Sequence, residues 1–292
     1  MSLSRRHLIG TAALASLSLV RQTLAQPSLL PLDTPGLDHL DVIVPDVEKT
    51  ARFYMGLLKT TLHAQPFQGG QRYFVLLGPL PDNRAVGYLA IGDARGRGTY
   101  IGHFCTSVVE WRRDSQAIFA AMADRFAAAG LGDFPGPTGV GGIFEDPDGI
   151  EIQFLPAPDT LVTAAVPSAL VAGGQGLLTP LGVDHVLLNV TDLERALVYY
   201  RILYGAESAH SVEGDSVFAF RNGSRLLLRQ GHYAYDSAEA RIARFGLRVA
   251  PFDRDRAAEL IVTLGGTVLT AEAAEGLRFK DVDGAEVVLV SA

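Results

Sequence analysis

The feature that most limits the fold of this chain is an internal duplication. Residues 36–54 align without gaps on residues 182–200, and seven of the nineteen positions are identical. Later in each half, residues 144–155 match residues 279–290, and both stretches carry an Asp-X-Asp-Gly turn followed by an alternating strand. Two such patterns recurring in the same order indicate two copies of one folding unit.

Each half contains a smaller repeated pattern. In the first half, an alternating strand at 37–44 precedes Asp46, a suitable N-cap, and an amphipathic helix that runs to about residue 58. Three short strands follow, and the pattern restarts with a strand at 100–108 and a helix predicted over residues 115–129. The predicted unit is strand, helix and three strands, used four times, which makes the chain an α+β protein.

Composition predicts where the chain divides. Residues 36–156 and 182–292 are the two predicted domains, and residues 157–181, rich in Pro, Gly and Ala, form the predicted linker. Residues 1–25 contain paired arginines, a short apolar run and a small-residue cleavage site, which is typical of a twin-arginine signal peptide. We therefore expect a periplasmic protein with no stable membrane anchor after cleavage. Removal of this segment takes away three arginines and no acidic residue, so the charge changes from −7 to −10.

Charge and cysteine content exclude several functions. An acidic chain with no basic cluster beyond its N-terminus is a poor candidate for binding nucleic acid. The single cysteine, Cys105, excludes an internal disulfide and a multi-cysteine metal cluster. The glycines at 92–98 do not lie between a strand and a helix, so no nucleotide cofactor is expected. A small molecule is the expected partner, and the oligomeric state stays open.

The order of the elements resembles the vicinal oxygen chelate superfamily, which includes glyoxalase I, extradiol dioxygenases and bleomycin-resistance proteins. The similarity rests on "DHL…VPDVEKTARFY" at the start of a half and "DPDGIEIQF" at its end. It implies four βαβββ modules in two tandem glyoxalase-like domains, with mixed, cupped sheets and flanking helices. Such a fold by itself indicates little about the reaction.

Strand alternation places the candidate site residues. Residues two apart share a face, so His103 lies with Cys105 and Gln153 lies with Glu151. His39 and His103 occupy matching positions, each five residues before a valine. If the cup of the superfamily forms, the resemblance implies that His39, His103 and Gln153 converge as metal ligands.

The remaining candidates surround these three. Asp41, on the face of His39, and Cys105 are predicted to contact substrate, and Glu151 and Tyr88 are the candidate acid/base groups. The fourth ligand position of glyoxalase I corresponds to Ala90, so that pattern is broken. The resemblance implies a divalent metal, Fe(II), Mn(II), Zn(II) or Ni(II), in the N-terminal domain only.

The second half provides an internal comparison. His185, Arg244 and Val288 stand at the positions of His39, His103 and Gln153. An arginine repels a cation and valine offers no donor, so this half is expected to bind no metal. Glu286 matches Glu151 in that half, so a structural role for Glu151 stays open.

Two functions follow from these patterns. The first is a metal-dependent enzyme, a dioxygenase or a glyoxalase-like lyase or isomerase, that acts on a small molecule with vicinal oxygens. The second is a metal-free protein that binds or sequesters a small molecule in an apolar cup with a few polar groups.

Overall fold

The structure is a computed structural model that describes residues 28–67, 70–78, 87–109, 111–138, 142–157, 176–210, 214–231, 242–269 and 276–292. The predicted signal segment, residues 1–25, and most of the predicted linker lie outside these residues. Within the described part of the chain, no helix is both long enough and apolar enough to cross a membrane.

Four helices of the predicted kind follow the strands that open each unit. They are α1 (Val47–Leu57), α2 (Trp111–Ala128), α4 (Leu193–Tyr204) and α5 (Arg254–Thr263). The predicted N-cap of α1 is confirmed, because the Asp46 side chain accepts a hydrogen bond from the Lys49 amide at 3.0 Å. Helix α2 begins four residues earlier than predicted, since the Trp111 ring packs edge-on against Phe119 and Phe154 at centroid distances of 5.3 and 5.5 Å.

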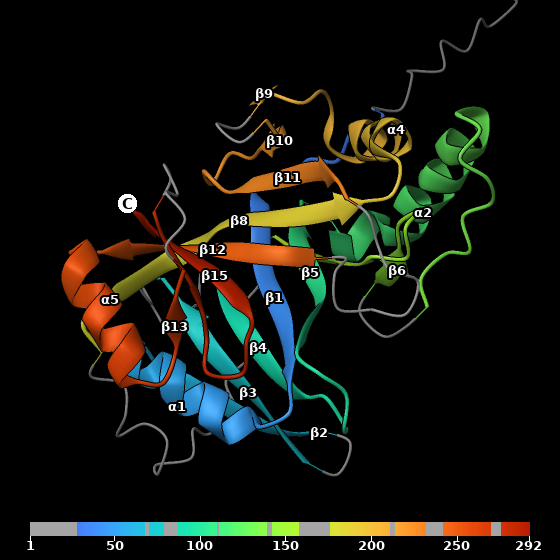
Figure 1. The fold of residues 1–292 in the computed structure, drawn as a ribbon. Helices are drawn as coiled ribbons and strands as arrows, with labels where there is room; N and C mark the ends of the chain where they lie inside the picture. The colour runs from blue at the N-terminus through green and yellow to red at the C-terminus, as the bar shows by residue number, and fades with distance from the viewer. Residues whose placement is uncertain are drawn as a thin grey trace, which may run out of the picture.

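The strands form two mixed sheets, one from each half, which cross near the centre of the molecule (Figure 1). The first sheet has the order β2-β3-β4-β1-β5-β7-β6. Its strands are β1 (Gly36–Val44), β2 (Leu62–Phe67), β3 (Gly70–Leu77), β4 (Gly87–Asp93), β5 (Tyr100–Val108), β6 (Ile143–Glu145) and β7 (Glu151–Pro156).

The second sheet has the order β13-β14-β15-β12-β8-β11-β10-β9. Its strands are β8 (Thr179–Val190), β9 (Ala209–His210), β10 (Ser216–Ala219), β11 (Arg225–Gln230), β12 (Ile242–Ala250), β13 (Thr267–Val268), β14 (Leu277–Lys280) and β15 (Glu286–Ser291). The predicted α+β fold is thus confirmed, with one mixed sheet built from each half.

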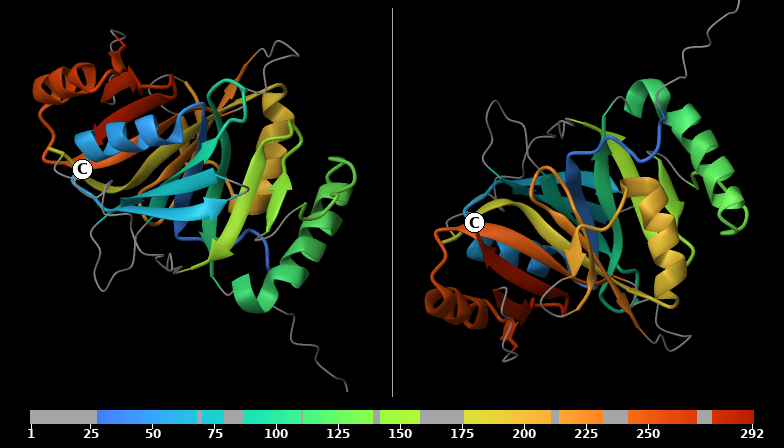
Figure 2. Two further views of the ribbon diagram at one scale, coloured as in Figure 1. Left: turned by 90° about the horizontal axis from the view of Figure 1, so that it is seen from below. Right: turned by 90° about the horizontal axis from the view of Figure 1, so that it is seen from above.

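One hydrophobic core joins the two halves. Leu40, Val42 and Val44 of β1 are fully buried in it, whereas His39 and Asp41 point to the opposite face of the sheet. Helices α1 and α5 lie side by side at one end of the molecule, and α2 and α4 lie side by side at the other (Figure 2). Helices from different halves therefore pair, and the helical side of each sheet is buried while its cup faces away from the core.

The repeated Asp-X-Asp-Gly turns fasten each half to the helix of the other. The Tyr54 hydroxyl of α1 donates to Asp281 at 2.9 Å, and the Tyr200 hydroxyl of α4 donates to Asp146 at 2.8 Å. Each aspartate also accepts hydrogen bonds from amides within its own turn. The duplicated tyrosine and the duplicated turn are thus two ends of one contact, which we call the tyrosine–turn clasp.

The second unit differs from the other three within the described residues. In the fourth unit β13 follows α5, but residues 131–138, which follow α2, run without regular structure. This stretch holds Pro135 and Pro137, and proline cannot donate a backbone hydrogen bond to a sheet. The first sheet consequently has one strand fewer than the second among the described strands.

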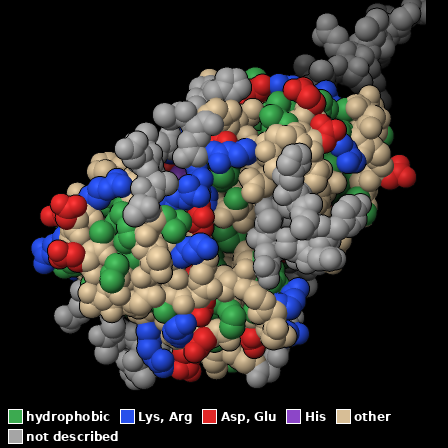
Figure 3. Space-filling view, in the orientation of Figure 1, with side chains coloured by type: hydrophobic (Ala, Val, Ile, Leu, Met, Phe, Trp, Pro, Cys, Tyr) green, Lys and Arg blue, Asp and Glu red, His purple; other side chains and the backbone are tan. Residues whose placement is uncertain are grey.

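The surface is mixed in charge on the face seen in Figure 3. Lysine and arginine side chains alternate there with acidic side chains and apolar groups (Figure 3). Among the described residues, ion pairs join Lys49 to Asp283 at 2.9 Å and Arg225 to Asp184 at 2.6 Å.

Candidate functional site

Four neighbouring strands carry the residues that the sequence singled out. Strands β4, β1, β5 and β7 are consecutive in the first sheet, and they contribute Tyr88, His39, His103 and Gln153. In the backbone register, His39 lies opposite Tyr88, and Cys105 lies opposite Gln153. Gly87 allows β4 to come this close, since a Cβ atom there would lie 2.0 Å from the Asp38 carbonyl oxygen.

The centre of the site is a pair of buried histidines. His39 and His103 are 2% and 5% exposed, and their Nε2 atoms face each other at 3.3 Å. Their rings meet edge-on, with centroids 5.4 Å apart. Two nitrogens that bind one metal at about 2.0–2.1 Å lie roughly 2.8–3.0 Å apart in octahedral geometry and roughly 3.3–3.4 Å apart in tetrahedral geometry. The observed separation fits that requirement.

A carboxylate lies behind each imidazole. The Nδ1 atom of His39 is 2.9 Å from Asp38, which also accepts a hydrogen bond from the Ser107 hydroxyl at 2.9 Å. The Nδ1 atom of His103 is 3.5 Å from Asp41, and Asp41 in turn pairs with Arg72 at 2.6 Å. A carboxylate at Nδ1 fixes the tautomer that leaves the Nε2 lone pair available for a metal.

The protonation state of His103 also suits a ligand. Burial lowers the pKa of His103 well below its ordinary value, and the charges of His39 and Arg72 lower this pKa further. A hydrogen bond with the Gln153 side chain acts in the opposite direction, but it is the smallest of these effects. The imidazole of His103 is therefore neutral at pH 7, which metal binding requires.

Tyr88 and Gln153 complete the inner group. The Tyr88 hydroxyl lies 3.3 Å from Nε2 of His39, and the two rings stack with centroids 4.1 Å apart. Gln153 reaches His103 by its side chain. The structure thus links a phenol, two imidazoles and a neutral amide in a chain of contacts from Tyr88 to Gln153. Nitrogen and oxygen donors of these types suit Zn, Fe, Ni and Mn better than they suit Ca or Mg.

Cys105 lies close to both His39 and Asp38. Its side chain is fully buried, and a ligand atom from each of Asp38, His39 and Cys105 lies within 4.8 Å of the other two. This trio is a second candidate metal group in the same half. It fits less well, because the Asp38 carboxylate is already engaged by both His39 and Ser107. The burial of Cys105 also keeps it away from the open hollow, so the predicted substrate contact stays a prediction.

A hollow of about 300 Å³ opens beside the histidines. His103, Asp41 and Glu151 line it, with Arg72 and Tyr100 among its other walls. Burial raises the pKa of Glu151, and the nearby Glu145 and Asp41 carboxylates raise it further. A carboxyl group with a raised pKa holds its proton to a higher pH than an ordinary glutamate, which suits a role in proton transfer.

The matching positions of the second half hold different chemistry. His185 keeps its aspartate, Asp184, at 2.8 Å, but the residue opposite it in register is Arg225 instead of a tyrosine. Arg244 and Val288, both buried, occupy the places of His103 and Gln153. Arginine is always protonated and cannot bind a metal, so these three positions supply at most one ligand.

The structure also separates Glu151 from its counterpart. Glu286 accepts a hydrogen bond from Nε of Arg278 at 2.7 Å, an arginine that stands where the first half has Ile143. Glu151 faces the hollow instead. The same glutamate therefore serves a local ion pair in one half and lines the candidate site in the other.

Two residues of the site had no place in the sequence prediction. Asp38 could have been found, because the Asp-His pair recurs as Asp184-His185 and an aspartate beside a buried histidine is a common orienting partner. Arg72 could not, since it comes from β3 and nothing in its sequence neighbourhood points to Asp41. Only the sheet order brings these two together.

The chain resembles a known family in sequence and solved structures in fold. Residues 36–154 match the family model of the Glyoxalase/Bleomycin resistance protein/Dioxygenase superfamily. Among curated protein sequences, none matches the chain at a significant level. The family match covers the half that contains the paired histidines and supports the superfamily.

Solved structures share the fold along almost the whole chain. The 2,3-dioxygenase LapB from Pseudomonas sp. KL28 is 16% identical, with 90% of this chain and 93% of that chain covered and a TM-score of 0.60. A catechol 2,3-dioxygenase is 14% identical, with 89% of each chain covered and a TM-score of 0.63. The Mn(II)-bound glyoxalase from Novosphingobium aromaticivorans is 12% identical, with 88% and 82% covered and a TM-score of 0.56. At these identities, the likeness shows the fold alone.

Proposed function

We propose that this chain is an exported, metal-dependent enzyme of the glyoxalase and dioxygenase superfamily that acts on a small molecule with two adjacent oxygen atoms. The observation that carries the proposal is the pair of buried Nε2 atoms, 3.3 Å apart, on His39 and His103. The family match over residues 36–154 and the metal-bound glyoxalase and dioxygenase folds among its structural neighbours support it.

The residues divide into three roles in this proposal. His39 and His103 hold the metal, with the Gln153 amide oxygen as a weak third ligand. A divalent metal, when bound, supplies Lewis-acid chemistry to oxygens of the substrate. Asp38 and Asp41 keep the two imidazoles oriented. The hollow of about 300 Å³ is within the range of small-molecule sites and has room for a single substituted ring.

Proton transfer falls to Glu151 or Tyr88. Glu151 lines the hollow, and its raised pKa keeps part of its population protonated closer to neutrality than an ordinary glutamate. The Tyr88 hydroxyl lies beside His39 and is the second group within reach of the inner site. Ring-cleaving dioxygenation and glyoxalase-like isomerisation or lyase chemistry both use a group of this kind, and the residues present fit either reaction.

Metal analysis of the protein exported through its native route tests the proposal. We expect near-stoichiometric metal in the wild type, loss of metal in His39→Ala and in His103→Ala, and retention in His185→Ala, the matched histidine of the second half. Absence of metal from the wild type, together with a thermal stability that a chelator leaves unchanged, would overturn the metal-dependent function.

A metal-free binding protein is the second candidate, and one observation favours it. Nε2 of His39 lies 3.3 Å from the Tyr88 hydroxyl, which can donate a hydrogen bond to it, and the Gln153 side chain forms a hydrogen bond with His103. The pair can therefore be satisfied by hydrogen bonds alone. Titration with catechol, a small vicinal diol, separates the two functions. The enzyme binds catechol only after metal loading, whereas a metal-free binder takes it up equally well in the presence of a chelator.

A further inference from the structure

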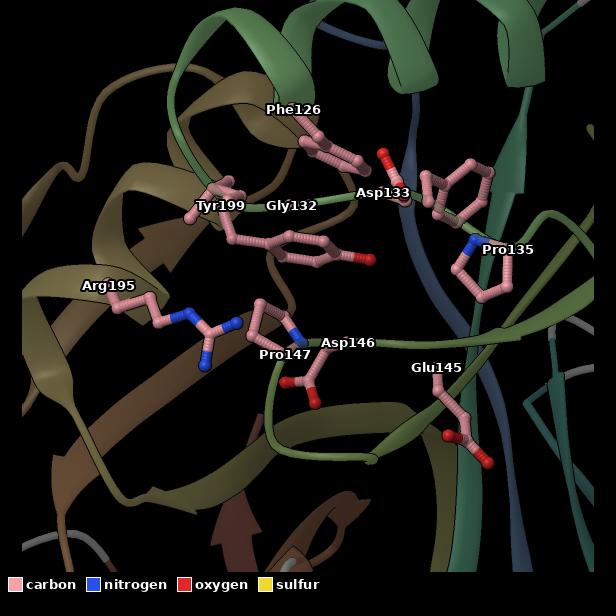
Figure 4. Close-up of a pocket in the computed structure, with 11 residues that line it drawn as sticks. Phe126, Gly132, Asp133, Pro135, Glu145, Asp146, Pro147, Arg195 and Tyr199 are labelled. Atoms are coloured by element: carbon pink, nitrogen blue, oxygen red, sulfur yellow. The ribbon is translucent and has the colours of Figure 1, made fainter.

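A second cavity lies on the helical side of the molecule (Figure 4). Neither His39 nor His103 lines it. It has a volume of about 140 Å³ and sits between α2 of the first half, α4 of the second half and the turn that joins β6 to β7. Its apolar walls are Phe126, Leu131, Phe134, Pro135, Pro147 and Tyr199. A cavity of about 150 Å³ is large enough to take up benzene.

The irregular segment after α2 creates this space. In the fourth unit β13 fills the corresponding place beside its helix, whereas Gly132 and Pro135 of residues 131–138 form an open loop. The wall opposite the loop crosses the boundary between the halves, where Phe126 of α2 stacks on Tyr199 of α4 with centroids 4.5 Å apart. The cavity is thus built from both copies of the duplicated unit.

One polar group in the cavity lacks a partner. Tyr199 is 3% exposed, and its buried hydroxyl has no hydrogen-bond partner among the described residues. Figure 4 shows this hydroxyl directed into the space between Asp133, Pro135 and Pro147. Burial and the neighbouring Asp146 raise the pKa of Tyr199 well above its ordinary value, so the hydroxyl stays protonated and is available as a donor. A buried, unpaired hydroxyl is costly and is normally satisfied.

The charges around the cavity restrict which ligand group can accept a hydrogen bond from the Tyr199 hydroxyl. Asp133, Glu145 and Asp146 line the cavity, against a single cation, Arg195. This excess of carboxyl groups disfavours an anion, although an anion would otherwise be the strongest acceptor for the Tyr199 hydroxyl. A cation has no lone pair to offer that hydroxyl. A neutral hydroxyl group meets both demands, because it accepts from Tyr199 and can donate to a carboxylate at the rim.

We propose that this cavity is a binding site for an uncharged monocyclic phenol, held by the aromatic and proline walls and by a hydrogen bond from Tyr199. The ring size follows from the volume, and the hydroxyl follows from the unpaired donor among carboxylates. The site is distinct from the hollow beside His103, since the two share no lining residue among the described residues, and it does not depend on metal binding.

Fluorine NMR of 4-fluorophenol titrated into the full chain tests the proposal. We expect saturable binding that persists in His103→Ala, and an affinity about three- to tenfold lower in Tyr199→Phe, which keeps the ring but removes the donor. Tyr204→Phe is the matched control, because the Tyr204 hydroxyl already pairs with Thr106 at 3.2 Å outside the cavity. Fluorobenzene, which lacks the hydroxyl, should bind wild type and Tyr199→Phe alike.

Equal affinity of 4-fluorophenol for wild type and Tyr199→Phe would overturn the proposal, as would the absence of saturable binding. A crystal soaked with 4-bromophenol gives an independent readout if Tyr199→Phe folds poorly. A bromine anomalous signal between Pro135 and Pro147 supports the site, and a single water on the Tyr199 hydroxyl at the same soak concentration contradicts it.

Discussion

Gln153 and Val288 occupy the same place in two copies of one strand, and they differ in the one property that a metal site requires. Both follow an Asp-X-Asp-Gly turn, and each lies on a strand that pairs in parallel with the strand that opens the second unit of its half, β5 or β12. Gln153 offers an oxygen next to His103, whereas Val288 offers none next to Arg244. At the scale of single residues, duplication thus preserved the strand and changed the side chains that carry chemistry.

Asp38 gives a prediction at this scale. Its carboxylate holds Nδ1 of His39 at 2.9 Å, and replacing such an orienting group lowers metal affinity by about 10- to 100-fold. We expect Asp38→Asn to weaken Mn(II) or Zn(II) binding by that factor in a calorimetric titration. Asp184→Asn makes the same change beside His185 and should leave the affinity unaltered. An equal loss in both variants would show that the effect is on stability and not on the site.

Gln153 gives a second prediction at the residue scale. A carboxylate binds a divalent cation more tightly than a neutral amide oxygen, so Gln153→Glu is expected to raise the affinity for Mn(II) at least about tenfold. Val288→Glu provides the control, because its half lacks the second histidine. Unchanged affinity in Gln153→Glu would place the side chain outside the metal site.

At the scale of elements, the two tyrosine–turn clasps explain why the turn and the helix were duplicated together. Each clasp joins a helix of one half to a turn of the other through a buried tyrosine hydroxyl and an aspartate. Neither half can complete this contact alone. The duplicated sequence therefore encodes an association of the halves as well as their separate folds.

Removal of one clasp should cost a measurable part of the stability. Tyr54→Phe and Tyr200→Phe each remove one buried hydrogen bond, which contributes about 1–2 kcal/mol to the free energy of unfolding. Urea denaturation should show that loss in each variant and close to the sum in the double variant, since the clasps share no residue. Tyr73→Phe, in the middle of β3, is the control. Losses below about 0.5 kcal/mol would mean that the clasps contribute little net stability.

The individual helices and strands were the part of the fold that could be predicted best from the sequence. Asp46 marked the start of α1, and alternation marked β1 and β5, because both signals are local. The start of α2 was not foreseen. Trp111 extends the helix by packing on Phe154, a residue of a distant strand, and such tertiary contacts leave no periodic mark in the sequence.

The candidate site was predictable to a similar extent. Alternation placed His39 and His103 on the cup face, and the structure brings them together with Tyr88 and Gln153. Their direct contact and the pairing of Arg72 with Asp41 depend on strand order, which no single strand encodes. The assignment of the metal to these residues stays a prediction.

At the scale of the whole molecule, burial of Asp146 makes stability depend on pH. Burial raises the pKa of Asp146 from 3.8 to about 7, and repulsion from Asp148 adds to this rise, while hydrogen bonds from Ile150 and Tyr200 oppose it. The folded state thus holds a proton that the unfolded state has released. The stabilisation is complete below about pH 4 and is lost as the pH rises to about 7.

This difference is expected to reach at most about 4 kcal/mol between pH 4 and pH 7. Asp146→Asn, which is neutral throughout, should flatten the stability profile over that range in urea titrations at a series of pH values. Asp253→Asn, at the exposed N-cap of α5, should leave the profile of the wild type intact. A slope between pH 4 and 7 that Asp146→Asn does not change would assign the pH dependence to other groups.

X-ray absorption at the zinc edge of the zinc-loaded full chain tests the central claim most directly, because it reports the atoms that bind the metal. Zinc–nitrogen and zinc–oxygen distances are about 2.0–2.2 Å, and zinc–sulfur distances are about 2.3 Å. The paired histidines predict a shell of two imidazoles and oxygen donors without sulfur, reduced to one imidazole in His103→Ala and unchanged in His185→Ala. A sulfur scatterer from Cys105, or a spectrum that His103→Ala leaves unchanged, would contradict the assignment of the metal site to His39 and His103.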